Sequence, residues 1–272
     1  MKLAVSNIAW TVEQDDAVAS AFVELGVRGI EVAPTKIWPA PLDATDVQID
    51  AYRQFWESRG IEIVASQALL FGKPELTLFE NEETRNRTLD YLRGIVRVCA
   101  RLGAGALVFG SPVNRRVGDG NPDAAWTAAV DFFGRLGESA LSEGTAIVME
   151  ANPREYKADF ATRASDALRL VREVNHPGFL LHLDTACMTL AGDPVSLIGE
   201  SMDLLRHFHV SEPFLGPIGP DKVDHAQFAS ELSGRGYSHW ISIEMRESQP
   251  FAVENLSSAV RFTLEAYGNE AR

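Results

Sequence analysis

Four short apolar segments in the second half of the chain each end in a side chain that can bind a metal ion. These side chains are Glu150, Asp184, His209 and Glu244, and each follows a run with the length and composition of a β-strand. Residues on four separate strands can meet only where the C-terminal ends of parallel strands converge, as they do in a closed barrel. The site therefore predicts an α/β fold, a (β/α)8 barrel with its active site at the C-terminal ends of the strands.

The rest of the chain alternates strand-like and helix-like segments in the same way. Apolar runs of strand length are followed by amphipathic stretches that mostly end at glycine, which is typical of repeated βα units. The predicted strands are residues 3–8, 29–32, 61–66, 106–109, 146–150, 179–184, 205–210 and 240–245. The predicted helices are residues 15–25, 45–58, 82–102, 122–143, 165–174, 194–202, 224–233 and 251–267. Long loops after the third, fourth and seventh strands are candidate substrate-binding loops.

Strand parity places the four candidate ligands on one face. Side chains two residues apart on a strand point the same way, so the last inward-facing side chain of each strand lies at the mouth of the barrel. His182 and His207 precede two of the ligands by two residues, so we expect them one layer deeper, as core or supporting residues. A single acid at a strand end is commonly a helix cap or a solvated residue. Four suitable residues of the same parity on successive strands favour a metal site.

The donor atoms of this set indicate the class of ion. Three carboxylates and one imidazole suit a divalent cation such as Mn²⁺ or Mg²⁺ better than a structural zinc, which favours thiolates. We expect one divalent ion, with Mn²⁺ preferred and Mg²⁺, Co²⁺ or Zn²⁺ as alternatives. Such an ion acidifies the C–H beside a carbonyl that it binds together with a neighbouring hydroxyl, and it stabilises the enediolate that forms. Two bases on opposite faces would give epimerisation, and one base moving a proton between neighbouring carbons would give isomerisation.

Composition limits the partners and the location. A chain of 272 residues with 46% hydrophobic residues has the size of one barrel domain, which we expect to span 1–272. The net charge of −13 argues against nucleic acid or an anionic membrane as a partner. The two cysteines make no disulfide framework. The chain begins without a signal-like leader and has no stretch of membrane-spanning length, so we expect a cytoplasmic protein.

The segments around the four ligands resemble the xylose isomerase-like barrel superfamily. The resemblance runs from the first strand to the last helix and includes Gly236-Tyr237 leading through Trp240 into Glu244. The run from residue 150 to 160 also resembles a branch of sugar phosphate isomerases and epimerases, and the superfamily includes AP endonuclease family 2-like members. In its epimerase branch, Glu, Asp, His and Glu on strands five to eight bind one divalent metal.

This resemblance implies specific roles for residues of this chain. Glu150 and Glu244 would be catalytic acid and base as well as ligands, and the substrate would be a small sugar or keto-polyol. Related enzymes are often dimers or tetramers, so a homodimer or homotetramer is implied. The chain departs from the ketose epimerase pattern at Cys187 and Leu215, which stand where a histidine and an arginine are usual. Candidate substrate-binding residues that compensate for these departures are Asn152, Tyr156, His225 and Arg246, with Arg154 and Lys222 as further polar residues in the same loops.

Other members of the superfamily supply the alternatives. A nuclease of the endonuclease IV type needs histidines after strands three, four and six, where this chain has Ser66-Gln67, Gly110-Ser111 and Cys187. A metal-dependent lyase of the inosose dehydratase type would use the same metal and base, so it stays open. A non-catalytic barrel that binds a sugar is the remaining alternative. The favoured interpretation is a metal-dependent isomerase or epimerase of a carbohydrate.

Overall fold

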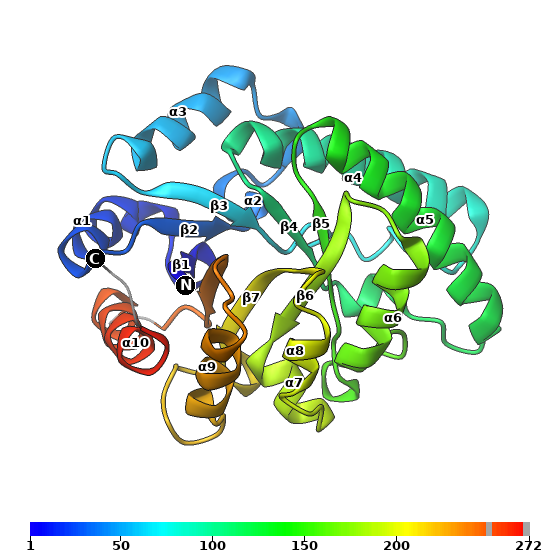
Figure 1. Ribbon diagram of the computed structural model, residues 1–272. Coiled ribbons are helices and arrows are strands. Elements are labelled where there is room, and N and C mark those ends of the chain that lie inside the picture. The colour runs from blue at the N-terminus through cyan, green and yellow to red at the C-terminus, as the bar shows by residue number, and fades with distance from the viewer. Residues whose placement is uncertain (249–251, 269–272) are drawn as a thin grey trace.

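Eight parallel strands close into one barrel in the order of the chain. The computed structural model describes residues 1–248 and 252–268, and within these residues the sheet runs from β1 to β8 and back to β1 (Figure 1). The strands are β1 (Lys2–Ser6), β2 (Gly29–Val32), β3 (Glu62–Ser66), β4 (Ala106–Phe109), β5 (Ile147–Glu150), β6 (Phe179–Asp184), β7 (Leu205–Ser211) and β8 (Trp240–Glu244). The predicted (β/α)8 barrel is confirmed.

Helices cover the outside of the barrel (Figure 1). They are α1 (Asp15–Leu25), α2 (Pro34–Ile37), α3 (Asp46–Glu57), α4 (Glu82–Leu102), α5 (Pro122–Ser142), α6 (Ala164–Val174), α7 (Thr185–Ala191), α8 (Leu197–Glu200), α9 (His225–Gly234) and α10 (Ala252–Tyr267). The last helix, α10, packs beside α1 and so closes the outer ring. Gly26 and Gly103 end α1 and α4 with φ of 75° and 98°, a left-handed conformation that glycine adopts without strain. Of the helices in the described residues, none has both the length and the apolar composition needed to cross a bilayer.

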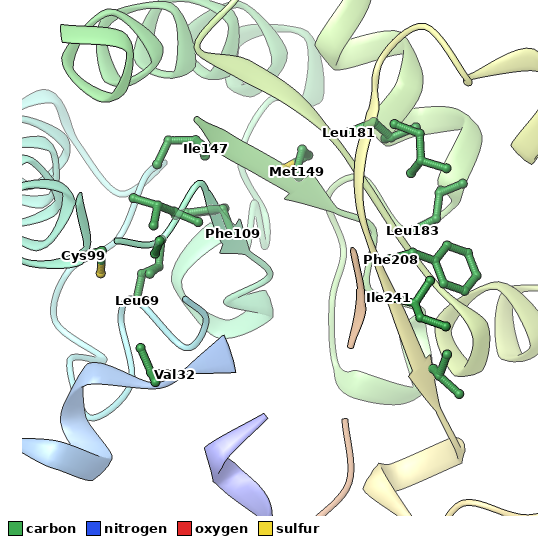
Figure 2. Packing of buried hydrophobic residues seen from close by; sticks show 14 of the residues in the cluster. Val32, Leu69, Cys99, Phe109, Ile147, Met149, Leu181, Leu183, Phe208 and Ile241 are labelled. Atoms are coloured by element: carbon green, nitrogen blue, oxygen red, sulfur yellow. The ribbon is translucent and has the colours of Figure 1, made fainter. Parts of the chain in front are cut away.

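Strand parity divides the core into two parts. Outward-facing side chains such as Met149, Leu183 and Phe208 pack under the helices, and Figure 2 shows them on strands of the barrel wall. Inward-facing side chains such as Ala106 and Val148 form a smaller apolar layer inside the barrel. Burial of a large aliphatic or aromatic side chain contributes about 1.5–3 kcal/mol, so the outer layer dominates the stability of the fold. The inner layer supports the polar residues at the barrel mouth.

The structure differs from the predicted elements at several strand and helix ends. The first strand stops at Ser6, because the Ser6 hydroxyl accepts a hydrogen bond from the amide of Ile8 and the chain turns into a 3₁₀ helix (Asn7–Ala9). The helix predicted over 194–202 is shorter in the structure, where only α8 is helical within that range. Residues 195–196 form a turn before it, and α7, which was not predicted, begins directly after Asp184. The predicted start of the last helix at Phe251 lies outside the described residues.

Candidate metal centre and active site

The four predicted ligands converge at the C-terminal ends of β5 to β8. The Nδ1 atom of His209 lies 3.7 Å from Oε1 of Glu150, 3.8 Å from Oδ2 of Asp184 and 3.5 Å from Oε2 of Glu244. These separations are too long for good hydrogen bonds, although all four side chains point at one place. One ligand atom from each of Glu150, Asp184 and His209 lies within 4.8 Å of the others, a spacing that one metal ion can bridge.

The stagger of the barrel strands brings these residues to one level. Glu150 pairs with His182 in register, Asp184 with His209, and Glu244 with Ser211. Neighbouring strands are thus displaced along the barrel, as closure of a tilted sheet requires. Strand parity predicted the shared inward face, and the stagger decides which inward residues become neighbours.

Glu31 on β2 fixes the orientation of His209 from the other side. The His209 Nε2 atom lies 2.8 Å from Oε2 of Glu31, and both residues are completely buried. Because the carboxylate accepts the Nε2 proton, the other ring nitrogen, Nδ1, points toward the three carboxylates, where it makes no hydrogen bond within the described residues. In neutral His209 this nitrogen carries a lone pair. A buried lone pair facing three carboxylates is repulsive unless a proton or a cation lies among them. The residues therefore fit a divalent cation.

The pKa values in the cluster report the same repulsion. Burial raises the pKa of Glu150 to about 8, and the neighbouring charges of Glu244 and Asp184 add to the effect. Burial likewise raises the pKa of Asp184, again with a contribution from Glu244. Burial lowers the pKa of His209, but Glu31 and Glu244 outweigh it and hold the value well above the ordinary one. Without a cation the cluster relieves its charge by binding protons, and a cation would displace them.

Two buried residues behind Glu150 hold its carboxylate. Asn152 donates a hydrogen bond of 2.7 Å from Nδ2 to Oε2 of Glu150. Arg115, which is fully buried, donates to the side chain of Asn152 at 2.8 Å and to the backbone carbonyl of Glu150 at 2.9 Å. A Cβ atom at Gly110 would lie 2.3 Å from Oε2 of Glu150, so any larger residue here would displace this carboxylate oxygen. Arg115 belongs to a loop predicted to bind substrate, but it supports the cluster from behind.

Asp184 is held just as firmly. Its Oδ1 accepts a hydrogen bond of 2.6 Å from the amide of Cys187, which makes Asp184 the N-cap of α7. Its Oδ2 accepts a hydrogen bond of 2.5 Å from the hydroxyl of Ser211 on β7. Ser211 lies two residues after His209 on the same strand, so strand parity could have identified it. Both carboxylate oxygens have fixed partners, which leaves little freedom of movement.

A pocket of about 430 Å³ opens over the cluster. Glu150, His209 and Glu244 line it, whereas Asp184 does not. The side chains of Glu150 and Glu244 are 11% and 16% exposed, against 2% for Asp184. The remaining wall comes from strand β4 and from segments that follow several strands. It combines apolar and cationic groups, among them Ile8, Lys36, Gln67, Val108, Leu215 and Arg246. The pocket and the cluster form one candidate active site.

The four predicted substrate-binding residues lie in different places, and only Arg246 of the four lines the pocket. Arg246 lines the pocket, while Asn152 is buried behind Glu150. The Tyr156 hydroxyl accepts a hydrogen bond from the amide of Phe214 at 2.9 Å, beside the pocket lining rather than in it. His225 is buried between Glu212 at 3.1 Å and the Tyr267 hydroxyl at 2.7 Å, and it is absent from the residues that line this pocket. Binding of substrate by these residues stays a prediction.

The two positions that depart from the ketose epimerase pattern and two further loop cations also differ in their distance from the pocket. Leu215 lines the pocket. Cys187 is buried, with its sulfur 3.9 Å from Nδ2 of Asn152. Arg154 begins the 3₁₀ helix that ends at Tyr156 (η5, Arg154–Tyr156), and Lys222 lies in the loop before α9. Neither of these two cations lines the pocket.

The two deeper histidines lie directly beneath the carboxylate cluster. His182 Nε2 is 3.6 Å from Oε1 of Glu150, and His207 Nε2 is 3.5 Å from Oε2 of Glu31. His182, His207 and His209 also form a group whose nitrogens could hold an ion. His209 is common to both groups. Variants of the other members can therefore distinguish a carboxylate site from a histidine site.

Glu31 was not predicted from the sequence, and its role can be tested directly. Glu31→Gln keeps a hydrogen-bond acceptor for His209 but removes the negative charge that makes the ring a stronger ligand. We expect the dissociation constant for Mn²⁺ to rise about 10- to 100-fold, as for other residues that orient metal-binding histidines. Competition with a chelator of known affinity measures this constant.

A matched control for Glu31→Gln is Glu212→Gln. Glu212 is also a buried acid within hydrogen-bond distance of a histidine, His225, but it is not a member of the cluster. Its replacement should leave Mn²⁺ affinity unchanged. Equal affinity of Glu31→Gln and the unmodified protein, or equal losses in both variants, would contradict the role assigned to Glu31.

Comparison with known proteins identifies the family and the fold. A family model described as xylose isomerase-like TIM barrel matches residues 19–266. A ketose 3-epimerase from Arthrobacter globiformis is 28% identical over 182 residues, which cover 66% of this chain and 56% of that protein. The alignment thus spans little more than half the length of this relative.

Solved structures share the barrel over nearly the whole chain. The D-psicose 3-epimerase from Clostridium cellulolyticum H10, crystallised with D-tagatose, has a TM-score of 0.84 at 16% identity, with coverage of 99% of this chain and 100% of that chain. The IOLI protein, solved with a binding zinc atom, has a TM-score of 0.78 at 18% identity, with coverage of 98% of each chain. At these identities the likeness establishes the fold.

Proposed function

The chain belongs to the xylose isomerase-like TIM barrel family, and we propose that it is a divalent metal-dependent epimerase or isomerase of a sugar or related keto-polyol. The observation that carries the proposal is the setting of His209. Its Nε2 is fixed by Glu31, and its Nδ1 faces the carboxylates of Glu150, Asp184 and Glu244 at the floor of a pocket. The ketose 3-epimerase relative supports the choice of a carbohydrate substrate.

Glu150, Asp184, His209 and Glu244 would hold the ion. Three oxygen donors and one nitrogen donor suit Mn²⁺ first, with Mg²⁺, Co²⁺ and Zn²⁺ as alternatives. A bound divalent cation would supply Lewis-acid chemistry, lowering the pKa of the C–H beside the substrate carbonyl. Asp184 has both oxygens held by protein donors and does not line the pocket, so we assign it to binding the ion alone.

Glu150 and Glu244 are the groups placed to move the proton. Both line the pocket, and they stand on β5 and β8, the two outer strands of the four that carry the cluster. One carboxylate removes the proton next to the carbonyl, giving an enediolate, and the other returns a proton to the opposite face. Asn152 keeps Oε2 of Glu150 in place during this exchange. Return from the opposite face gives an epimer, and return at the neighbouring carbon gives an isomer.

The apolar wall at Leu215 predicts poor turnover of free ketohexoses. Leu215 and the buried Cys187 provide no hydrogen bonds to sugar hydroxyls at positions where the ketose epimerase pattern has an arginine and a histidine. Hydroxyls that lose water without gaining a partner weaken binding. We expect kcat/KM for fructose and psicose at least about 100-fold below that for the best substrate. Steady-state kinetics of the unmodified protein and of Leu215→Arg test this, and efficient turnover of either sugar by the unmodified protein would contradict it.

Metal analysis followed by hydrogen exchange tests the proposed function. The purified protein should contain about one divalent ion per chain after Mn²⁺ loading and dialysis. Incubation with a panel of keto sugars and inososes in D₂O, followed by NMR, should place deuterium on the carbon beside the carbonyl of a substrate. A dehydrated product would identify a lyase instead. Protein that binds neither ion nor sugar would overturn the proposal.

A further inference from the structure

A second, apolar pocket adjoins the candidate active site, and we propose that it holds an aromatic, uncharged substituent of the sugar substrate. This pocket, called the side groove below, has a volume of about 360 Å³ and lies between the loop after β3 and the loop after β4. It shares Ala68, Phe71 and Ser111 with the pocket over the cluster. The inference rests on the proposed function, because it concerns the substrate of the same site.

The side groove is built by hydrogen bonds between the two loops. Asn114, which is buried, donates from Nδ2 to the carbonyls of Lys73 at 2.7 Å and Leu76 at 2.8 Å. The Asn114 carbonyl in turn accepts a hydrogen bond of 2.9 Å from the amide of Leu78. A single residue thus connects the β4 loop to the β3 loop through its side chain and its backbone carbonyl. A groove fixed in advance loses little conformational entropy when a ligand enters.

The lining of the side groove selects the chemistry of its occupant. Most of its side chains are apolar, and two of them are unusually exposed for their type, Phe71 at 71% and Val113 at 52%. Among the lining residues Lys73 is the single charged one, and no acid is present. A second sugar ring would need more polar partners for its hydroxyls, and a phosphate group would need more cationic donors. An aromatic ring can cover Phe71 and Val113 without either.

The shared residues allow one ligand to occupy both pockets. Phe71 lines the side groove and also the pocket that contains Glu150 and Glu244. The volumes of about 430 and 360 Å³ together match ligands larger than a monosaccharide. Ala68 and Ser111, which join the pockets, have φ of 55° and 43°. Such left-handed conformations are costly for residues other than glycine and cluster at ligand sites.

A pair of simple glycosides tests the side groove without requiring turnover. We expect phenyl β-D-glucopyranoside to bind about tenfold more tightly than methyl β-D-glucopyranoside, because only the first buries an aromatic ring. Isothermal titration calorimetry in buffer containing MnCl₂ measures both affinities. Phe71→Ala should remove most of the preference, and Val113→Ala should reduce it. Val47→Ala is the matched control, since Val47 is 77% exposed on α3 and lines neither pocket.

Three results would overturn the proposal that the side groove holds an aromatic substituent. They are equal affinity for the two glycosides, no binding of either, and a phenyl preference that persists in both groove variants. Loss of a dimer in Phe71→Ala by sedimentation, with no phenyl preference in the unmodified protein, would assign the groove to a second copy of the chain and reject the proposal. A phenyl preference without stoichiometric metal or deuterium exchange would contradict the proposed function. The proposal for the side groove would still hold.

Discussion

His209→Ala and Asp184→Ala should each abolish stoichiometric metal binding. His209 contributes the only nitrogen of the proposed ligand set, and Asp184 contributes a carboxylate that both Ser211 and Cys187 hold in place. Their removal leaves the other carboxylates facing each other without a complete set of donors. Elemental analysis after Mn²⁺ loading and dialysis measures the loss. A second measure is thermal stability, because an ion at about 100 times its dissociation constant stabilises the folded state by about 2.7 kcal/mol.

The deeper histidines provide the control for these two variants. His182→Ala and His207→Ala each remove a member of the group of three histidines while sparing the carboxylate ligands. We expect both to retain a bound ion, with a weaker affinity at most. Circular dichroism should show the same secondary structure in all four variants, since the ligands lie at the barrel mouth above the inner apolar layer. Full Mn²⁺ occupancy in Asp184→Ala together with its loss in His182→Ala would indicate that the ion binds at the group of three histidines instead.

Local patterns in the sequence were sufficient to predict the barrel and the convergence of the four candidate ligands. A strand alternates its side chains with a period of two, so the inward face of each strand can be derived from its own residues. Parallel strands then bring their C-terminal ends to one mouth. Glu150 and His209 were predicted together on this basis, although they are on strands separated by β6. The prediction needed no knowledge of loops.

Residues that act across the barrel or through loop paths were not predictable in this way. Glu31 contacts His209 from β2, and a single acid in a short apolar strand gives no signal about its partner. Arg115 was grouped with a predicted substrate loop, but the path of that loop turns it inward beneath Asn152. His225 was considered for substrate binding, while the packing of α9 against α10 places it beside Tyr267. These contacts depend on tertiary packing, which a local pattern does not encode.

Glu244→Gln should reduce proton transfer by about 10²- to 10⁴-fold, the usual contribution of a general acid or base. Glutamine keeps an oxygen donor for the ion, so a substantial fraction of the variant should still load with Mn²⁺. The rate of deuterium incorporation beside the substrate carbonyl, divided by the bound metal, isolates the proton-transfer defect. Asp184→Asn is the matched comparison. It also replaces a carboxylate ligand by an amide, but at a residue that does not line the pocket.

Glu150→Gln should show the same loss of proton transfer and a larger loss of metal. In the unmodified protein one oxygen of Glu150 accepts from Asn152 while the other faces His209. Glutamine has a single carbonyl oxygen, which must serve either Asn152 or the ion. Its NH₂ group would otherwise face the donor of Asn152 or the cation, and both arrangements are repulsive. Near-normal exchange per bound ion in both glutamine variants would exclude the two glutamates as acid and base. A defect confined to one of them would indicate a single base that moves the proton between neighbouring carbons, and therefore an isomerase rather than an epimerase.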